Sequence, residues 1–217
     1  MKGDILIIHN LHRKAARQAV ELMLPEISDF EGRYCITVAG ESGAGKSEVA
    51  AAIASVLEKK GFPSYVFQQD DYFIYPPGTN AAKRQEDIGW VGMQEVKLSQ
   101  LDANIEAARS GNDIIEKPLV IFDEDLITSE KVDLGGYKVL IAEGTYTSAL
   151  KQADCRIFID RNMEDTKKAR LKRGREKQDA FLEQILRIEH GIISAQKKDA
   201  DIIITRKYEA IKQARHE

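Results

Sequence analysis

The sequence predicts an α/β fold in which a parallel sheet of five strands is flanked by helices. Three observations support this: short apolar runs recur along the 217 residues, stretches of helical spacing separate them, and a glycine-rich loop joins one run to the next helical stretch. Hydrophobic residues make up 43% of the chain and charged residues 31%, which is typical of a globular protein rather than a disordered one.

The expected strands are apolar runs with no polar face, which indicates strands buried in the middle of a sheet. They are residues 34–39, 64–68, 138–142, 155–159 and 201–205. Residues 112–137 differ, because short apolar stretches alternate there with turn-forming and acidic residues. We expect this segment to form a β-hairpin that leaves the sheet.

The expected helices carry apolar residues three and four positions apart. They are residues 48–60, 95–109, 163–172 and 180–195, with Asn162 as a candidate cap of the third. Near the start, residues 11–24 have the same spacing and end before Pro25. This pattern predicts a helical extension over residues 1–30 that packs on a main domain at 31–217.

Composition narrows the partners that the chain is expected to have. Lys and Arg total 32 against 35 Asp and Glu, so a dominant surface for nucleic acid is disfavoured. The longest opening apolar run, residues 5–8, is too short for a membrane helix or a signal peptide. Cys35 and Cys155 lack metal-ligand spacing, so reduced thiols in the cytoplasm are expected. Homo-oligomer formation stays open, because one unaligned sequence carries no reliable signature of it.

Residues 40–47 read GESGAGKS and match the phosphate-binding loop pattern G-x-x-x-x-G-K-[ST] between an apolar strand and a helix. In such a loop the backbone N–H groups face the phosphates of a nucleotide, the lysine reaches the β and γ oxygens, and the hydroxyl ligates Mg²⁺. The predicted nucleotide-binding residues are therefore Gly40, Ser42, Gly43, Ala44, Gly45, Lys46 and Ser47. ATP and Mg²⁺ are the expected cofactors, with Lys46 also acting on the transferred phosphate.

The loop alone does not separate GTPases, motor ATPases and small-molecule kinases. A GTPase would carry Asn-Lys-x-Asp to select guanine, and no asparagine in this chain is followed by lysine. The switch-like pattern D-x-x-G at Asp133 precedes an expected strand. These two observations disfavour a GTPase.

Carboxylates at the ends of two expected strands point to phosphoryl transfer. Asp70 follows the second strand in Gln-Asp-Asp-Tyr-Phe, and Glu143 ends the third. Asp70 is the candidate base for the acceptor hydroxyl and a candidate metal ligand, and Glu143 is a second metal ligand. The alternative is that Asp70 or Asp71 caps a turn and that Glu143 begins a loop.

A basic segment follows the fourth strand. Arg170 and Arg173 are predicted to neutralise charge in the transition state, and Arg175 is predicted to contact the nucleotide. Residues 170–178 are therefore a candidate lid. The alternative is an ordinary solvated charge run.

Taken in order, the strand entering 40–47, the Gln-Asp-Asp-Tyr-Phe segment, Ala-Glu-Gly at 142–144 and the Arg-rich segment make residues 34–205 resemble the uridine kinase and phosphoribulokinase family. The resemblance implies a cytoplasmic kinase that transfers the γ-phosphate of ATP to a hydroxyl of a nucleoside-like or sugar-like acceptor. It also implies that Asp70 is the base and that Ser47 and Glu143 lie near Mg²⁺.

The acceptor end departs from that family. Where uridine kinases grip ribose with an aspartate, this chain has Val91, and Glu95 or Asp87 is the candidate substitute. Tyr72 is a second candidate acceptor contact. Trp90 and Phe122 are candidates for stacking on a flat acceptor, although lone aromatics more often pack in a core.

Three functions therefore stay open. They are a uridine kinase-like enzyme, a kinase for another metabolite such as pantothenate, glycerate or a sugar, and a protein that binds ATP without transferring phosphate.

Overall fold

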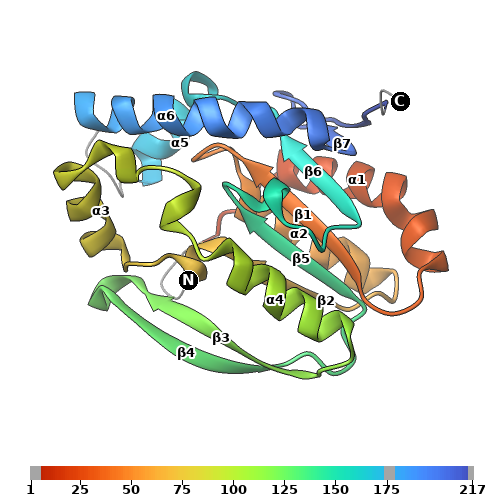
Figure 1. The fold of residues 1–217 in the computed structure, drawn as a ribbon. Helices are drawn as coiled ribbons and strands as arrows, with labels where there is room; N and C mark the ends of the chain where they lie inside the picture. Colours follow the sequence, from red (N-terminus) through yellow and green to blue (C-terminus); the bar gives the residue numbers. More distant parts are fainter. Residues whose placement is uncertain (1–5, 174–178, 215–217) are drawn as a thin grey trace.

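The structure is a computed structural model that describes residues 6–173 and 179–214. At its centre lies a six-stranded sheet (Figure 1). Its strands are, in sheet order, β2 (Ser64–Gln68), β5 (Val139–Gly144), β1 (Tyr34–Gly40), β6 (Cys155–Ile159), β7 (Ile202–Ile204) and β8 (Ala210–Lys212). The first five run parallel, and β8 runs antiparallel to β7. The predicted parallel strands are thus confirmed.

The sixth strand was not predicted. β8 is three residues long and lies at the edge of the sheet, where Ile211 and Lys212 are exposed and Ala210 is half-buried. A strand at the edge of a sheet can be largely exposed, so its sequence need not be an apolar run. By contrast, every residue of β1 and β5 is buried, which explains why their sequences are so clearly apolar.

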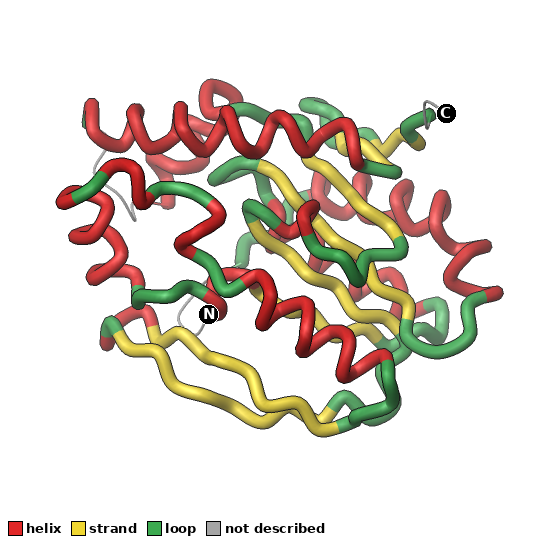
Figure 2. The backbone as a smooth tube through the Cα atoms, viewed as in Figure 1, coloured by secondary structure: helices red, strands yellow, loops and turns green. Residues whose placement is uncertain are grey.

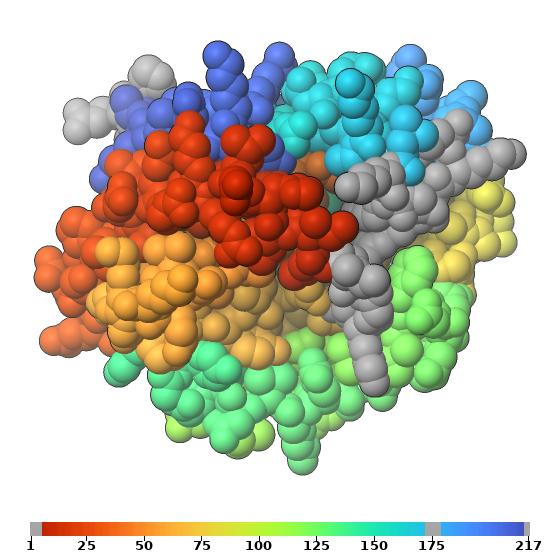
Figure 3. Space-filling view, turned by 180° about the vertical axis from the view of Figure 1, so that it is seen from behind, coloured from red at the N-terminus to blue at the C-terminus, as the bar shows by residue number. Residues whose placement is uncertain are grey.

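One face of the sheet is covered by α1 (Asn10–Asp29) and α2 (Lys46–Lys59), which share a core with β1, β5 and β6. Figure 3 shows both helices on the surface at the back of the molecule. The expected end before Pro25 is wrong, because α1 continues through this proline to Asp29. Burial of Ile27 below the last turn extends the apolar stripe of Ala16 and Val20, and this packing outweighs the bond lost at the proline.

The other face packs against α4 (Leu98–Arg109) and the antiparallel hairpin β3 (Ile114–Ile121) and β4 (Leu126–Asp133). The hairpin is a separate two-stranded sheet beside α4 (Figure 2), as predicted. One buried ion pair fastens it to the domain. The carboxylate of Asp71 accepts hydrogen bonds from Lys117 Nζ at 2.8 Å and from the backbone N–H of Val120 at 3.1 Å.

Three more helices lie near the carboxyl ends of the strands (Figure 1). They are α3 (Pro77–Glu86), α5 (Met163–Arg173) and α6 (Ala180–Gln196). The predictions for α5 and α6 are confirmed, and Asn162 caps α5 by accepting from the N–H groups of Glu164 and Asp165. α3 was not predicted from the sequence, because it buries a single residue, Asn80, and has no apolar stripe.

Two other sequence expectations concern surface and redox state. No helix in the described ranges combines the length and apolarity that a membrane crossing needs. Cys35 and Cys155 are both buried free thiols, as predicted. Burial, with a smaller contribution from the carboxylate of Asp154, raises the pKa of the Cys35 thiol to about 12. This thiol therefore behaves as a small core residue.

Candidate active site

The carboxyl ends of β2, β5 and β1 bring the predicted phosphate and carboxylate groups to one edge of the sheet. Glu143 in β5 stands beside Gln68 of β2 and Val38 of β1 in the parallel register. β1 leads directly into the phosphate loop, and β2 leads into a single 3-10 turn, η1 (Gln69–Tyr72), that carries Asp70. Because these strands are parallel, their carboxyl ends bring together residues that are far apart in the sequence.

The phosphate loop is held between α2 and α5. Gly43 adopts a φ of +76°, a left-handed conformation that favours glycine, and a Cβ there would lie 3.0 Å from Arg170 Cγ and 3.3 Å from Thr166 Cβ. Lys46 begins α2, and its Nζ donates to the backbone carbonyl of Glu41 at 3.1 Å, across the mouth of the loop. The loop is therefore ready to receive phosphate, with its lysine held over it.

Ser42, Lys46, Ser47, Asp70 and Glu143 line one cavity of about 350 Å³. The five residues come from the phosphate loop, α2, η1 and β5, and each was a predicted site residue. Gly40, Gly43, Ala44 and Gly45 form the backbone of the loop beside this cavity. The cavity joins the candidate nucleotide site to a second region lined by α3 and α6.

Glu143 titrates unusually because of its surroundings. Its pKa is raised to about 7, chiefly by burial of the side chain and next by the nearby carboxylate of Asp70, while Lys46 and a hydrogen bond from Ser47 act in the opposite direction. The ordinary value for glutamate is 4.5. These interactions place the Asp70 and Glu143 carboxylates and the Lys46 ammonium group within electrostatic reach of one another.

We expect Glu143→Gln to stabilise the protein without Mg²⁺ at pH 8 and to have little effect at pH 5. A raised pKa contributes stability below pH 4.5, and this contribution is lost as the pH rises through about 7. Above that pH the wild-type protein buries a charge that glutamine lacks, at a cost of about 2–4 kcal/mol. Urea unfolding with a chelator present, at both pH values, measures the difference.

Glu106→Gln, on the exposed face of α4, is the matched control. It should change the free energy of unfolding by less than about 0.5 kcal/mol at either pH. An equal effect of Glu143→Gln at pH 5 and pH 8 would contradict the assigned titration.

The donor set of the cavity suits Mg²⁺. A hydroxyl on Ser47 and carboxylates on Asp70 and Glu143 are hard oxygen ligands, and Mg²⁺ commonly takes one or two carboxylates together with phosphates and water. Among the described residues, no group of three or more His, Cys, Asp or Glu side chains forms a site that could hold a metal by itself. The ion is therefore expected to bind together with the nucleotide.

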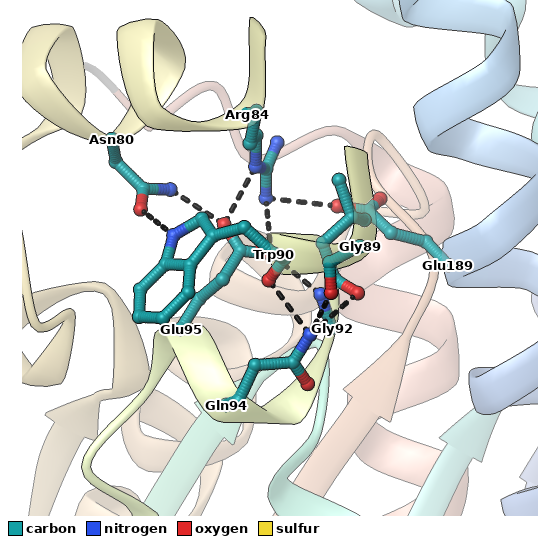
Figure 4. A network of polar contacts seen from close by, with 9 residues as sticks. Asn80, Arg84, Gly89, Trp90, Gly92, Gln94, Glu95 and Glu189 are labelled. Carbon is teal, nitrogen blue, oxygen red and sulfur yellow. Dashed lines mark hydrogen bonds and ion pairs between the residues drawn. The ribbon is translucent and has the colours of Figure 1, made fainter. Parts of the chain in front are cut away.

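A network of buried polar contacts forms the other end of the cavity (Figure 4). Glu95 is fully buried and accepts from Arg84 Nε at 2.6 Å, Asn80 Nδ2 at 2.6 Å and the N–H of Gly92 at 2.7 Å. Arg84 Nη2 also donates to Glu95 at 3.1 Å and to Glu189 of α6 at 3.2 Å. Asn80, Arg84 and Glu189 line the cavity, and Glu95 lies behind them.

Several sequence-predicted acceptor residues lie elsewhere. Tyr72 is fully buried in the core, and its hydroxyl donates to Asn104 at 3.0 Å. Trp90 donates its ring N–H to Asn80 at 2.9 Å, so it braces the network from behind, whereas Phe122 lines the cavity. The structure thus brings Phe122 to the site and keeps Tyr72, Trp90 and Glu95 outside the cavity wall.

The predicted basic segment is only partly described. Arg170 is buried, packs on the phosphate loop at Gly43, and donates through Nη1 to the carbonyl of Met163 at 2.8 Å and to the hydroxyl of Thr166. It borders the loop but does not line the cavity. The side chain of Arg173, and the whole of Arg175 and residues 174–178 of the candidate lid, lie outside the described residues.

The contribution of α6 to the cavity was not predicted from the sequence. Leu182, Ile185 and Leu186 face the cavity, and Glu189 on the next turn reaches Arg84. The following residue, His190, places Nδ1 2.5 Å from a carboxylate oxygen of Glu41 in the phosphate loop. The available signal was Glu189, an acidic residue among the apolar positions of α6, because burial of a carboxylate requires a partner.

A cluster behind the phosphate loop was also missed. The hydroxyl of Tyr208 donates to the carbonyl of Ala44 at 3.0 Å, and the guanidinium of Arg161 lies 4.9 Å from the centre of the Tyr208 ring. His12 of α1 packs against the same ring at a centroid distance of 5.0 Å. The N-terminal helix therefore packs against the loop through residues that do not line the cavity.

Comparisons with known proteins agree with this arrangement. A model of the phosphoribulokinase / uridine kinase family matches residues 35–211. A curated protein, the bifunctional alpha-galactosidase/sucrose kinase AgaSK of Mediterraneibacter gnavus, is 26% identical over 188 residues, which are 80% of this chain and 20% of that protein. The chain thus spans about a fifth of the length of the curated relative that it matches.

Two solved structures illustrate the shared fold. A candidate fructose transport system kinase from Silicibacter sp. TM1040 superposes with a TM-score of 0.65 and 18% identity, covering 83% of this chain and 94% of that one. Phosphoribulokinase from Rhodobacter spheroides superposes with a TM-score of 0.63 and 16% identity, covering 80% of this chain and 70% of that one. At these identities the likeness concerns the fold.

Proposed function

This chain belongs to the phosphoribulokinase / uridine kinase family, and from that premise we propose that it transfers the γ-phosphate of ATP to a hydroxyl of a small acceptor. The observation that carries the proposal is the single cavity lined by Lys46, Ser47, Asp70 and Glu143, which is continuous with a second polar region on α3 and α6. A phosphate donor and a hydroxyl acceptor can meet there with a carboxylate between them.

We assign the steps to residues as follows. Asp70 accepts a hydrogen bond from the acceptor hydroxyl and takes its proton as the oxygen bonds to the γ-phosphorus and the bond from that phosphorus to the β–γ bridging oxygen breaks, which releases ADP. Lys46 and the backbone N–H groups of the loop bind the phosphates, and Arg170 supplies positive charge from the α5 side. Ser47, Glu143 and Asp70 would hold Mg²⁺, which in such a site neutralises charge on the phosphate oxygens.

For the acceptor we propose a sugar-like or nucleoside-like compound, and the sugar-like reading gains support from one comparison. The curated relative carries sucrose kinase in its name, and it matches across 80% of this chain. The uridine-like reading rests on the family resemblance. The fully buried Glu95, a candidate substitute for the ribose-binding aspartate, is instead bonded to Arg84, Asn80 and Gly92, and this weighs against uridine as the acceptor.

The test is acceptor-dependent formation of ADP and phosphorylated product from Mg-ATP, measured by mass spectrometry across sugars, polyols, nucleosides, pantothenate and glycerate. We expect at least one acceptor to be phosphorylated, and we expect Lys46→Ala to abolish the product. The rival function, ATP binding without transfer, predicts nucleotide binding by calorimetry with no phosphorylated product from any acceptor. That outcome would reject the kinase.

A further inference from the structure

Tyr208 holds one peptide unit of the phosphate loop. Its hydroxyl donates to the carbonyl of Ala44 at 3.0 Å, and its side chain is buried in the core that α1 and α2 share with the sheet. The carbonyl of Ala44 and the N–H of Gly45 belong to the same planar trans peptide, so they point in opposite directions. The hydrogen bond with Tyr208 therefore turns the Gly45 N–H away from the tyrosine.

The Gly45 N–H has no partner among the described residues, where it donates to no protein oxygen. Gly45 precedes the first residue of α2, and the next two residues, Lys46 and Ser47, line the cavity, whereas Tyr208 does not. Backbone N–H groups at this place in a phosphate loop face the phosphates of the nucleotide. The orientation that Tyr208 imposes thus leaves this donor available to a phosphate oxygen.

The partners of the Tyr208 hydroxyl fix the position of its proton. A guanidinium group only donates, so the hydroxyl accepts from Nη1 of Arg161, and a carbonyl only accepts, so the hydroxyl donates to Ala44. Arg161 is held in turn by the backbone carbonyl of Asp165, which accepts from Nη2 at 2.9 Å. The contacts from Arg161 through Tyr208 to Ala44 therefore have one direction, and each hydrogen bond polarises the next.

The backbone of Tyr208 adopts a conformation that is uncommon for a bulky residue, with a φ of +57° in the left-handed region. The turn between β7 and β8 imposes it, because the N–H of Tyr208 donates to the carbonyl of Thr205 at 2.8 Å and the N–H of Thr205 donates to the carbonyl of Glu209 at 2.9 Å. Residues kept in such conformations cluster at ligand-binding sites, where the surrounding contacts hold them. The short edge strand β8 thus has the effect of placing this tyrosine beside the phosphate loop.

We propose, resting on the ATP binding of the kinase proposed above, that Tyr208 is a positioning residue for the nucleotide phosphates. It orients the Gly45 N–H towards them without touching the nucleotide, and Arg161 fixes its hydroxyl. Packing acts in the same direction, since a Cβ at Gly45 would lie 3.0 Å from the Tyr208 hydroxyl and 3.3 Å from Nε2 of His12. The loop backbone is thus both packed and hydrogen-bonded from this side.

The test compares Tyr208→Phe with the wild-type protein in calorimetric titrations with ATP and with inorganic tripolyphosphate, both in the presence of Mg²⁺. The dissociation constants of the two ligands should rise by the same factor, about tenfold, because a hydrogen bond to a charged group is misdirected. A loss of affinity for ATP but not for tripolyphosphate would mean that Tyr208 contacts the nucleoside, which overturns the proposal. Unchanged affinity for both ligands overturns it as well.

Arg161→Lys tests the partner of the tyrosine while Tyr208 stays in place. Lysine keeps the positive charge but not the planar fork that bonds Tyr208 and Asp165 together, so both dissociation constants should rise equally, by about twofold to fivefold. Wild-type affinity for both ligands would remove Arg161 from the positioning of the loop. A loss confined to ATP would again indicate contact with the nucleoside and contradict the proposal.

Tyr34→Phe is the matched control. Tyr34 is buried in the same core, starts β1 at the end of the strand opposite the phosphate loop, and its hydroxyl donates to Glu26 of α1 at 3.1 Å. Its loss should make unfolding easier but leave both dissociation constants within about twofold of the wild type, because distant sites act independently. Binding without phosphoryl transfer would reject the kinase and leave this inference standing, whereas a wild-type protein that binds neither ligand would overturn it.

Discussion

Replacement of Asp70 by asparagine should lower acceptor-dependent kcat by about 10²- to 10⁴-fold, the usual contribution of a positioned general base. Asparagine keeps the size of the side chain but cannot take a proton from the acceptor hydroxyl. Because Asp70 lines the cavity and is not part of the buried core, the free energy of unfolding should stay close to the wild-type value. Product formation at saturating Mg-ATP, with urea unfolding alongside, measures both quantities.

The neighbouring residue, Asp71, provides a control whose replacement should affect stability rather than activity. Asp71→Asn removes the charge of a buried partner of Lys117, which is 2% exposed and keeps its contacts with the Glu130 carboxylate at 2.9 Å and the Pro118 carbonyl at 3.1 Å. Unfolding should become easier by about 2–4 kcal/mol, because a buried charge loses its strongest partner. Each folded molecule should still transfer phosphate. If Asp71→Asn lost activity and Asp70→Asn lost stability, the assignment of the two carboxylates would be reversed.

A second large effect is expected at the end of β5. A Cβ added at Gly144 would lie 2.2 Å from Gln69 Cβ, a distance that no packing adjustment of a flexible side chain can relieve. Gln69 is fully buried, and its Oε1 accepts from the N–H of Tyr146 at 2.7 Å. Gly144→Ala should therefore cost about 3 kcal/mol or more of stability and displace the turn that carries Asp70, lowering kcat as well.

Gly191→Ala is the control for this substitution. Gly191 lies within α6, and nothing lies within 4 Å of the position that its Cβ would take. Alanine should stabilise the helix by up to about 1 kcal/mol, since glycine is a poor helix former. Urea unfolding of both variants tests the contrast, and a Gly144→Ala protein as stable as the wild type would show that β5 and η1 can separate without cost.

Sequence predicted the central fold because its strands are buried on both faces. β1, β5, β6 and β7 could be recognised as apolar runs, and the hairpin followed from its alternating pattern. The predictions failed for elements whose burial does not produce a regular apolar pattern in the sequence. β8 is an exposed edge strand, and α1 passes Pro25 because Ile27 packs below it. Both depend on tertiary contacts that local spacing does not encode.

The candidate site likewise has one part that could be predicted from the sequence and one part that could not. The phosphate loop, Asp70 and Glu143 could be predicted, since each lies at the end of a strand and parallel strands end together. The acceptor end could not, because Arg84 and Glu189 are 105 residues apart in the chain and meet only in three dimensions. Glu95 was predicted to contact the acceptor, and the structure places it behind the cavity wall.

The attachment of α3 bears on how such an enzyme changes during evolution. This helix buries one residue. At its start, the N–H groups of Gly78 and Thr79 donate to Asp125 at the hairpin tip. The phosphate loop lies elsewhere in the chain, between β1 and α2. Mutations that reshape it therefore leave the rigid sheet edge intact. For the kinase proposed above, selection could exchange one acceptor for another in small steps at α3 while the phosphate loop and its carboxylates stay as they are.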